Sequence, residues 1–79
     1  MYIVYVLKSK GDGKRYIGFT NNIVRRLFEH NNGLVKSTKN RRPLELIYSE
    51  ELDNKSSVME REEFLKSGKG REFLKNKNL

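Results

Sequence analysis

The stretch from Tyr16 to His30, YIGFTNNIVRRLFEH, constrains the fold most, because it changes from a strand pattern to a helix pattern within a few residues. Its first part belongs to a predicted strand over Arg15 to Phe19, rich in residues that favour strands. Asn21 or Asn22 can cap the helix that follows, since a short polar side chain accepts a hydrogen bond from the first free amides. A strand must therefore lead directly into a helix, which is predicted to end near residues 31–33, Asn-Asn-Gly.

Two basic side chains of this helix, Arg26 and His30, are neighbours because they lie four residues apart. On a helical wheel with about 100° per residue, both lie at one edge of an apolar arc, while Arg25 and Glu29 point to solvent. We expect the arc to face the body of the protein, with Arg26 and His30 beside Tyr16. The arc consists of Ile23, Val24, Leu27, Phe28 and Asn31.

Three segments are predicted to be strands. Tyr2 to Leu7, YIVYVL, contains only strand-forming and apolar residues, which is typical of a central strand covered on both faces. The turn sequence Gly11-Asp12-Gly13 joins it to the strand at 15–19 as a hairpin. The third strand is predicted over Leu44 to Ser49, where apolar and polar residues largely alternate.

The expected hairpin register pairs Lys8 with Gly13 and sets Tyr5 opposite Tyr16. Directly opposed residues point to the same face, so both phenols should project on one side. Gly18 follows Tyr16 by two positions and lies on that face as well. A glycine in a strand marks either a close approach of another group or a bend, or it opens space beside the following helix.

A second helix is predicted from about Ser56 to Lys66, and a short final helix over 70–75. The fold class expected is α/β, or α+β: a small three-stranded antiparallel sheet flanked by two or three helices. On the second helix Glu62 falls inside the apolar arc. An inward carboxylate costs free energy unless it is paired or binds a metal. An ion pair with Lys66, one turn further on, is the simpler of these two explanations.

Size and composition set further limits. The chain has 79 residues and no cysteine, so one domain over residues 1–79 is expected and neither a disulfide nor a thiolate metal site is available. No apolar run approaches the length of a membrane span. A cytoplasmic location is therefore expected.

The charge is strongly positive and unevenly distributed. Seventeen Lys and Arg oppose ten Asp and Glu, a formal net charge of +7. Basic blocks lie at 36–42 and 66–79, and most of the acids lie between Glu50 and Glu63. This distribution favours a surface that binds a polyanion. The first block contains Lys36, Lys39, Arg41 and Arg42.

Several of these residues recur at the spacing of a known family, and the chain resembles the GIY-YIG nucleases. Tyr16-Ile17-Gly18 matches the second tripeptide of that family, and Ile3-Val4-Tyr5 stands in place of the first, with Ile3 instead of glycine. Arg26 and His30 match the basic positions of the following helix. Glu62 matches the metal-binding glutamate. The likeness is to small stand-alone bacterial members similar to the excinuclease subunit.

This resemblance implies an endonuclease that hydrolyses phosphodiester bonds in DNA with Mg²⁺ or Mn²⁺. It implies catalytic roles for Tyr5, Tyr16, Arg26 and His30, a metal ligand in Glu62 and a structural role for Gly18. Either Tyr5 or His30 could take the proton first. We expect Lys36, Lys39, Arg41 and Arg42 to bind the nucleic-acid backbone without reading sequence. Branched, single-stranded or damaged DNA would then be the partner, as for relatives in DNA repair.

Two other functions are compatible with the sequence. A DNA- or RNA-binding module could keep the fold without catalysis, although it would have no need of Glu62 or Tyr5. A protein-interaction domain is disfavoured by the uneven charge.

Overall fold

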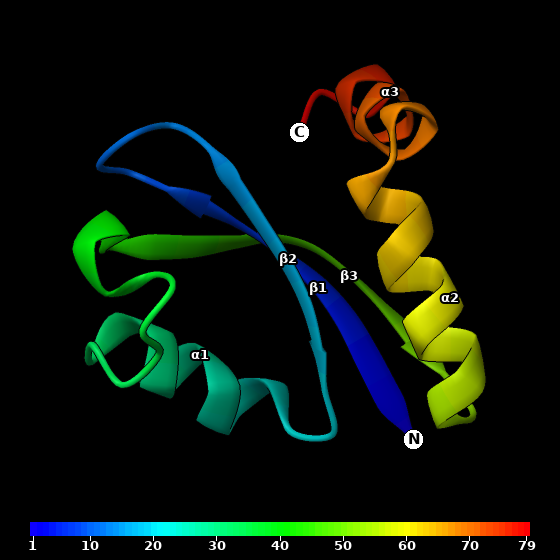
Figure 1. Cartoon of the computed structure of the whole chain (residues 1–79), viewed down its shortest axis with the longest axis horizontal. Helices are drawn as coiled ribbons and strands as arrows, with labels where there is room; N and C mark the ends of the chain where they lie inside the picture. Colours follow the sequence, from blue (N-terminus) through cyan, green and yellow to red (C-terminus); the bar gives the residue numbers. More distant parts are fainter.

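A three-stranded antiparallel sheet forms the middle of the computed structural model, which describes residues 1–79 (Figure 1). Strand β1 (Tyr2–Ser9) lies between β2 (Arg15–Thr20) and β3 (Leu44–Leu52), so the order is β2-β1-β3. The predicted central strand is therefore confirmed. Its run of branched and aromatic residues suits a position with a neighbour on each side and a core on each face.

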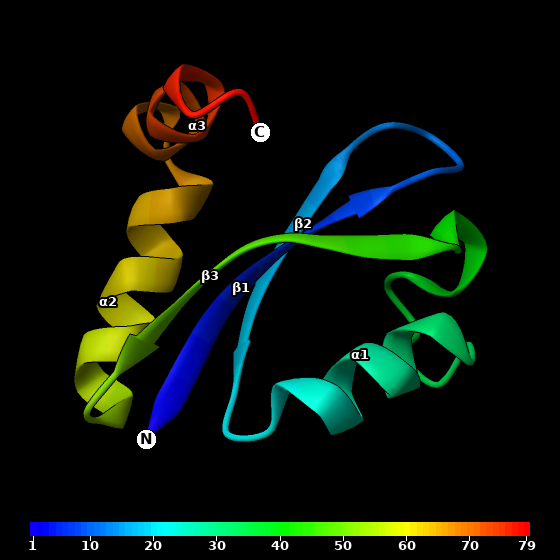
Figure 2. The same ribbon diagram turned by 180° about the vertical axis from the view of Figure 1, so that it is seen from behind.

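Helices cover both faces of the sheet (Figures 1 and 2). Helix α1 (Ile23–Asn31) lies on one side, and α2 (Lys55–Lys66) and α3 (Gly68–Asn76) lie on the other. Val4 and Val6 of β1 pack with Val58, Leu65 and Leu74 from α2 and α3. Tyr5 and Leu7 point to the opposite face and pack with Leu44, beside Tyr16, Ile23 and Leu27. The α+β fold class is as predicted.

Short polar side chains cap each of the three α-helices at its start. The side chain of Asn22 accepts a hydrogen bond from the amide of Arg25, that of Asn54 accepts one from Ser57, and that of Ser67 accepts one from Gly70. At the other end of α1, Gly33 has a φ of +74°, the left-handed conformation expected after the helix. None of the helices is long and apolar enough to cross a membrane.

The predicted hairpin register is wrong by two residues. Tyr5 lies opposite Gly18, Leu7 opposite Tyr16, and Lys8 opposite Arg15. The reason is the turn, where the Ser9 hydroxyl accepts hydrogen bonds from the amides of residues 11 and 12 and holds a longer loop. A shift of two residues preserves the side of the sheet, so Tyr5 and Tyr16 still share a face.

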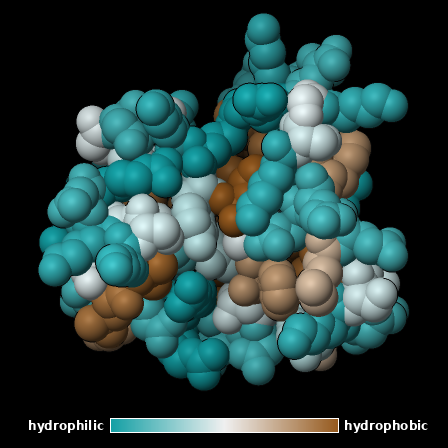
Figure 3. Space-filling model, in the orientation of Figure 1, coloured by the Kyte–Doolittle hydropathy of each residue, from teal (hydrophilic) through white to brown (hydrophobic).

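Helix α1 is rotated relative to its predicted orientation. Val24 and Phe28 were expected to face the sheet, but they are 79% and 61% exposed, and Figure 3 shows apolar side chains on the surface where α1 lies. The sheet instead meets the side that carries Ile23, Leu27 and His30. In this orientation His30 is buried and has two polar partners, Tyr5 of β1 and Thr38 of the loop after α1.

The remaining elements differ from their predictions mainly at their ends. The third strand continues to Leu52, and the last helix spans Gly68–Asn76 rather than 70–75. The predicted irregular loop over 34–42 contains one turn of 3-10 helix, η1 (Lys39–Arg41), and buries Val35 and Thr38. The sequence of this loop has no periodic apolar pattern, so the burial of these two residues could not be predicted from it.

Candidate active site

Gly18 provides room for the Tyr5 phenol on the α1 face of the sheet. A Cβ atom at residue 18 would lie 2.7 Å from the Tyr5 hydroxyl oxygen and 2.9 Å from its Cζ. It would also lie 3.3 Å from Cε2 of Tyr16. Distances this short leave no space for a side chain. Of the explanations considered for Gly18, close approach is therefore the one found, and the group that approaches is Tyr5 from the neighbouring strand.

The Tyr5 hydroxyl contacts both basic residues selected on α1. It lies 3.0 Å from Nε2 of His30 and accepts a hydrogen bond from Nε of Arg26 at 3.4 Å. Tyr5 is 1% exposed and His30 is fully buried. Because Arg26 and His30 lie one helical turn apart, the guanidinium and the imidazole both contact the hydroxyl oxygen of Tyr5.

Thr38 holds the other side of the imidazole. Its Oγ1 lies 2.8 Å from Nδ1 of His30, and the Thr38 hydroxyl donates to the carbonyl of Val35 at 3.5 Å. With that hydroxyl proton directed at Val35, Oγ1 accepts from Nδ1–H. Nε2 is then the acceptor and the Tyr5 hydroxyl donates to it. Thr38 could not be identified from the sequence, because a single threonine in a basic loop matches no motif.

Burial and charge set the protonation of this cluster. Loss of hydration, and then the charge of Arg26, lower the pKa of His30 from 6.5 to about 4. His30 is therefore neutral at pH 7, which agrees with its two hydrogen bonds. Burial also raises the pKa of Tyr5, although the hydrogen bond from Arg26 opposes this effect. Tyr5 is a neutral phenol when no substrate is present.

Arg26 is only partly enclosed, with a side chain that is 34% exposed. Its Nη1 donates to Oε1 of Glu29 at 3.1 Å. The hydrogen bond with Tyr5 raises the pKa of the guanidinium, so it remains charged. Glu29 was expected to point to solvent, but its side chain is 29% exposed and lies against Arg26. The rotation of α1 accounts for this difference.

Tyr16 connects the buried cluster to the surface. Its ring lies edge-on to that of His30, with centroids 4.9 Å apart, and its centroid is 6.4 Å from that of Tyr5. Unlike Tyr5, it is half-buried, and it lines a hollow at the surface. Tyr16 is the phenol that a bound molecule would meet first.

Glu62 lies on α2, across the sheet from α1, and lines a separate hollow with Ser56, Met59, Glu60 and Glu63. Its side chain is 20% exposed, and Oε2 lies 3.5 Å from Nζ of Lys66. The ion pair considered from sequence is therefore present. The negative charge of Glu62 also contributes to the raised pKa of Tyr5. This is the smallest of the effects on Tyr5, and no hydrogen bond or ion pair joins the carboxylate to Tyr5, Arg26 or His30.

The donor set around Glu62 suits one kind of metal ion. No group of three or more His, Cys, Asp or Glu side chains is placed to hold an ion, which disfavours zinc or a site built only from protein ligands. A lone carboxylate suits Mg²⁺ or Mn²⁺, because Mg²⁺ keeps several waters and takes further oxygens from a phosphate. The residues present therefore fit a hydrated ion shared with a substrate.

The four basic residues predicted to bind nucleic acid differ in their surroundings. Arg41 donates to Asp12 at 3.1 Å and to the carbonyl of Arg15 at 3.2 Å, so it ties the loop to the hairpin. Arg42 donates to the carbonyl of Lys39 at 2.8 Å, and both line a polar hollow of about 500 Å³. Lys36 is exposed. Arg42 and the two lysines remain the more accessible cations.

A comparison with known families matches residues 1–78 to the GIY-YIG catalytic domain. The chain belongs to the GIY-YIG family. It is 40% identical over 75 residues to a UPF0213 protein of Staphylococcus saprophyticus, a match that covers 94% of this chain and 90% of that one. It is 45% identical over 67 residues to a UPF0213 protein of Natronomonas pharaonis, covering 84% and 78% of the two chains.

The fold agrees with a solved structure of the same group. The solution NMR structure of the UPF0213 protein BH0048 from Bacillus halodurans matches with a TM-score of 0.58 and 32% identity. The match covers 96% of this chain and 84% of that one. The resemblance inferred from Tyr16-Ile17-Gly18 and the spaced residues is therefore confirmed, and this GIY-YIG protein is related to the small UPF0213 members.

Proposed function

We propose that this protein is a divalent-metal-dependent endonuclease that hydrolyses phosphodiester bonds in DNA, in a structure-directed rather than a sequence-specific manner. The observation that carries the proposal is the Tyr5 hydroxyl, held between Nε2 of His30 at 3.0 Å and Nε of Arg26 at 3.4 Å. A purely structural tyrosine needs one hydrogen-bond partner. Here the phenol has an acceptor for its proton and a cation beside the oxygen that would lose it.

The first part of the proposed mechanism is a proton relay. As a water attacks phosphorus, its proton passes to the oxygen of Tyr5 while the Tyr5 proton passes to Nε2 of His30. His30 can accept because it is neutral, with its pKa lowered to about 4. The negative charge that develops on the phosphate would favour the imidazolium while the reaction proceeds. The relay thus assigns Tyr5 and His30 as a pair, in place of a single base.

Arg26 has the second role. Its guanidinium is permanently charged and partly exposed, and it offers a planar set of donors that suits phosphate oxygens. A donor held ready for the transition state acts without reorganisation, and removing one costs ~10²–10³ in rate. Tyr16, half-buried beside His30, would orient the water or the phosphate. Glu29 keeps the guanidinium in place through its contact with Nη1.

Glu62 would hold Mg²⁺ or Mn²⁺ through its carboxylate. The ion, when bound, would stabilise the leaving oxygen and the charge of the phosphate. Lys66 pairs with Glu62 and would keep the carboxylate compensated until then. Lys36, Lys39 and Arg42 would contact backbone phosphates, which position a nucleic acid without reading its sequence.

The test is cleavage of end-labelled DNA by purified protein with Mg²⁺, with Mn²⁺ and with EDTA. Arg26→Ala and Glu62→Gln are expected to lose ~10²-fold or more in rate. Arg25→Ala and Glu63→Gln are matched controls, because both residues are exposed neighbours on the same two helices, and Arg25 lies 3.9 Å from Glu29 where Arg26 lies 3.1 Å from it. Equal rates in all variants would indicate a contaminating nuclease. DNA bound but never cut would favour the non-catalytic binding module.

A further inference from the structure

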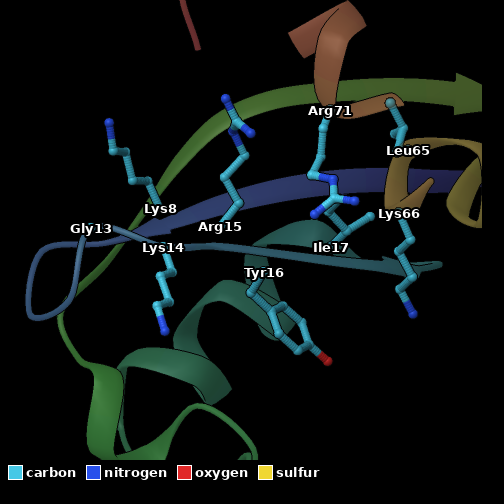
Figure 4. Close-up of a pocket in the computed structure, with 9 residues that line it drawn as sticks. All are labelled: Lys8, Gly13, Lys14, Arg15, Tyr16, Ile17, Leu65, Lys66 and Arg71. Carbon is cyan, nitrogen blue, oxygen red and sulfur yellow. The ribbon is translucent and has the colours of Figure 1, made fainter. Parts of the chain in front are cut away.

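A second basic surface lies away from the predicted basic loop, along the free edge of β2. There a hollow of about 660 Å³ opens between the hairpin and the junction of α2 with α3 (Figure 4). β2 is an edge strand, since only β1 pairs with it. The lining residues are Lys8, Gly13, Lys14, Arg15, Tyr16, Ile17, Leu65, Lys66 and Arg71.

Positive charge dominates this hollow. Five of its nine lining residues are Lys or Arg, and none is acidic. Two of the cations are engaged elsewhere, because Arg15 donates to the carbonyl of Leu79 and Lys66 pairs with Glu62. The other three, Lys8, Lys14 and Arg71, are exposed and form none of the ion pairs of the chain. They come from β1, the hairpin turn and α3, so only the folded protein brings them together.

The hollow leads to the candidate active site through Tyr16. Figure 4 shows Lys8 and Arg15 on one side of the strand and Lys14 and Tyr16 on the other, as the alternation of side chains in a strand requires. Cations thus border the edge of β2 on both sides. Tyr16 lines the hollow and also packs against His30. A chain of phosphates that followed the hollow would arrive at Tyr16, which packs against the buried imidazole of His30.

The apolar residues that line the hollow also favour a nucleic-acid strand as the ligand. Ile17 and Leu65 form part of its wall on the α2–α3 side of the sheet, and the Tyr16 ring lines it on the α1 side. A positively charged groove that also offers an aromatic face is the usual combination for nucleic-acid strands, because phosphates meet the cations and bases meet the flat or apolar groups. A small anion would need neither the length of this hollow nor its apolar part.

We propose that this β2-edge groove binds the phosphodiester backbone of the nucleic acid and leads it to Tyr16. The proposal rests on the proposed function, because it takes the substrate to be a nucleic acid. Lysines at an exposed strand edge also prevent sheets from pairing edge to edge. That role requires charge at the edge but no affinity for phosphates, so a binding measurement separates the two explanations.

The experiment compares two triple variants of equal charge. Lys8→Ala, Lys14→Ala and Arg71→Ala together remove the unpaired cations of the groove. Lys55→Ala, Lys69→Ala and Lys75→Ala remove three exposed lysines that line none of the hollows described above. Binding to fluorescein-labelled single-stranded and duplex DNA of equal length is followed by anisotropy in EDTA, so that no cleavage interferes. Thermal unfolding checks that both variants fold.

The groove variant is expected to bind roughly tenfold or more weakly, and the slope of log K against log salt should fall by about 2 to 3. The control should stay within about threefold of the wild type. The form of DNA that loses more affinity identifies the bound backbone as single-stranded or duplex. Equal losses in both variants, no loss in either, or no binding by the wild type would overturn the proposal.

The two proposals fail in different ways. If DNA binding depends on the groove cations but no DNA is cleaved, the endonuclease proposal is contradicted and the groove proposal stands. If cleavage requires Glu62 and Arg26 but both triple variants bind DNA equally well, the endonuclease proposal stands and the groove proposal fails.

Discussion

The hydroxyl oxygen of Tyr5 lies 2.7 Å from the position that a Cβ atom of residue 18 would occupy. The two residues are directly paired across β1 and β2. The absence of a side chain at Gly18 therefore determines where the phenol rests, and with it the contacts of Tyr5 with His30 and Arg26. A glycine of the family tripeptide thus acts on the site through the position of another residue.

Gly18→Ala should displace the Tyr5 phenol. Its Cβ would meet the hydroxyl and Cζ of a ring that is fully packed, and overpacking of this kind costs about 1–3 kcal/mol of stability. Urea unfolding measures this loss, and the nuclease assay should show a larger fall than the loss of folded protein explains. Gly68→Ala is the matched control, because nothing lies within 4 Å of its added Cβ. An unchanged Gly18→Ala protein would contradict the role assigned to the close approach.

Tyr5→Phe should separate the contribution of the hydroxyl group from that of the aromatic ring, because it removes only the hydroxyl. The ring still fills the core, but Nε2 of His30 and Nε of Arg26 lose their shared partner. A buried polar atom left unpaired costs about 1–3 kcal/mol, and under the proposed relay the cleavage rate should fall ~10²-fold or more. Tyr2→Phe serves as the control, since no hydrogen bond involves its hydroxyl. Full activity of Tyr5→Phe would exclude the relay.

The stability of the protein should fall as the pH drops from about 6.5 to 4. In this range unfolded His30 takes up a proton at its ordinary pKa of 6.5, whereas the folded state resists protonation until about 4. The unfolded chain thus binds more protons, and acid favours it by up to about 3 kcal/mol. His30 is the only histidine, so its NMR signal gives the titration directly. A midpoint near 6 in the folded protein would contradict this prediction.

Carboxylates titrate near pH 4 as well, so the stability measurement needs a reference. His30→Gln keeps a polar side chain at this position and removes the titration. Its stability should be lower at pH 7 but less dependent on pH between 6.5 and 4. The difference between the two curves isolates the contribution of the imidazole.

Local patterns were enough to predict the elements and part of the site. Strand propensity and the turn at 11–13 predicted the hairpin, and helical spacing predicted that Arg26 and His30 lie side by side. Helical spacing also predicted that Glu62 lies on the inner side of α2, where its side chain is 20% exposed. Each of these features depends on residues near one another in the chain.

Features that depend on distant residues could not be predicted in this way. The rotation of α1, which exposes Val24 and Phe28, goes with contacts of His30 to Tyr5 and Thr38, both of which lie outside the helix. The hairpin register follows from hydrogen bonds of the Ser9 hydroxyl inside the turn. The β2-edge groove combines cations from three separate elements, and in the sequence these appeared only as scattered charge.

Thr38 is expected to act as a positioning residue for His30. Thr38→Val keeps the shape of the side chain but removes Oγ1, which leaves Nδ1 of the buried imidazole without its partner at 2.8 Å. Stability should fall by about 1–3 kcal/mol. The tautomer that presents Nε2 to Tyr5 would no longer be favoured, so the pH profile of cleavage should shift, which a purely structural role would not cause. Thr38→Ser retains the hydroxyl and should restore the wild-type profile, whereas equal profiles for Val and Ser would assign Thr38 to packing alone.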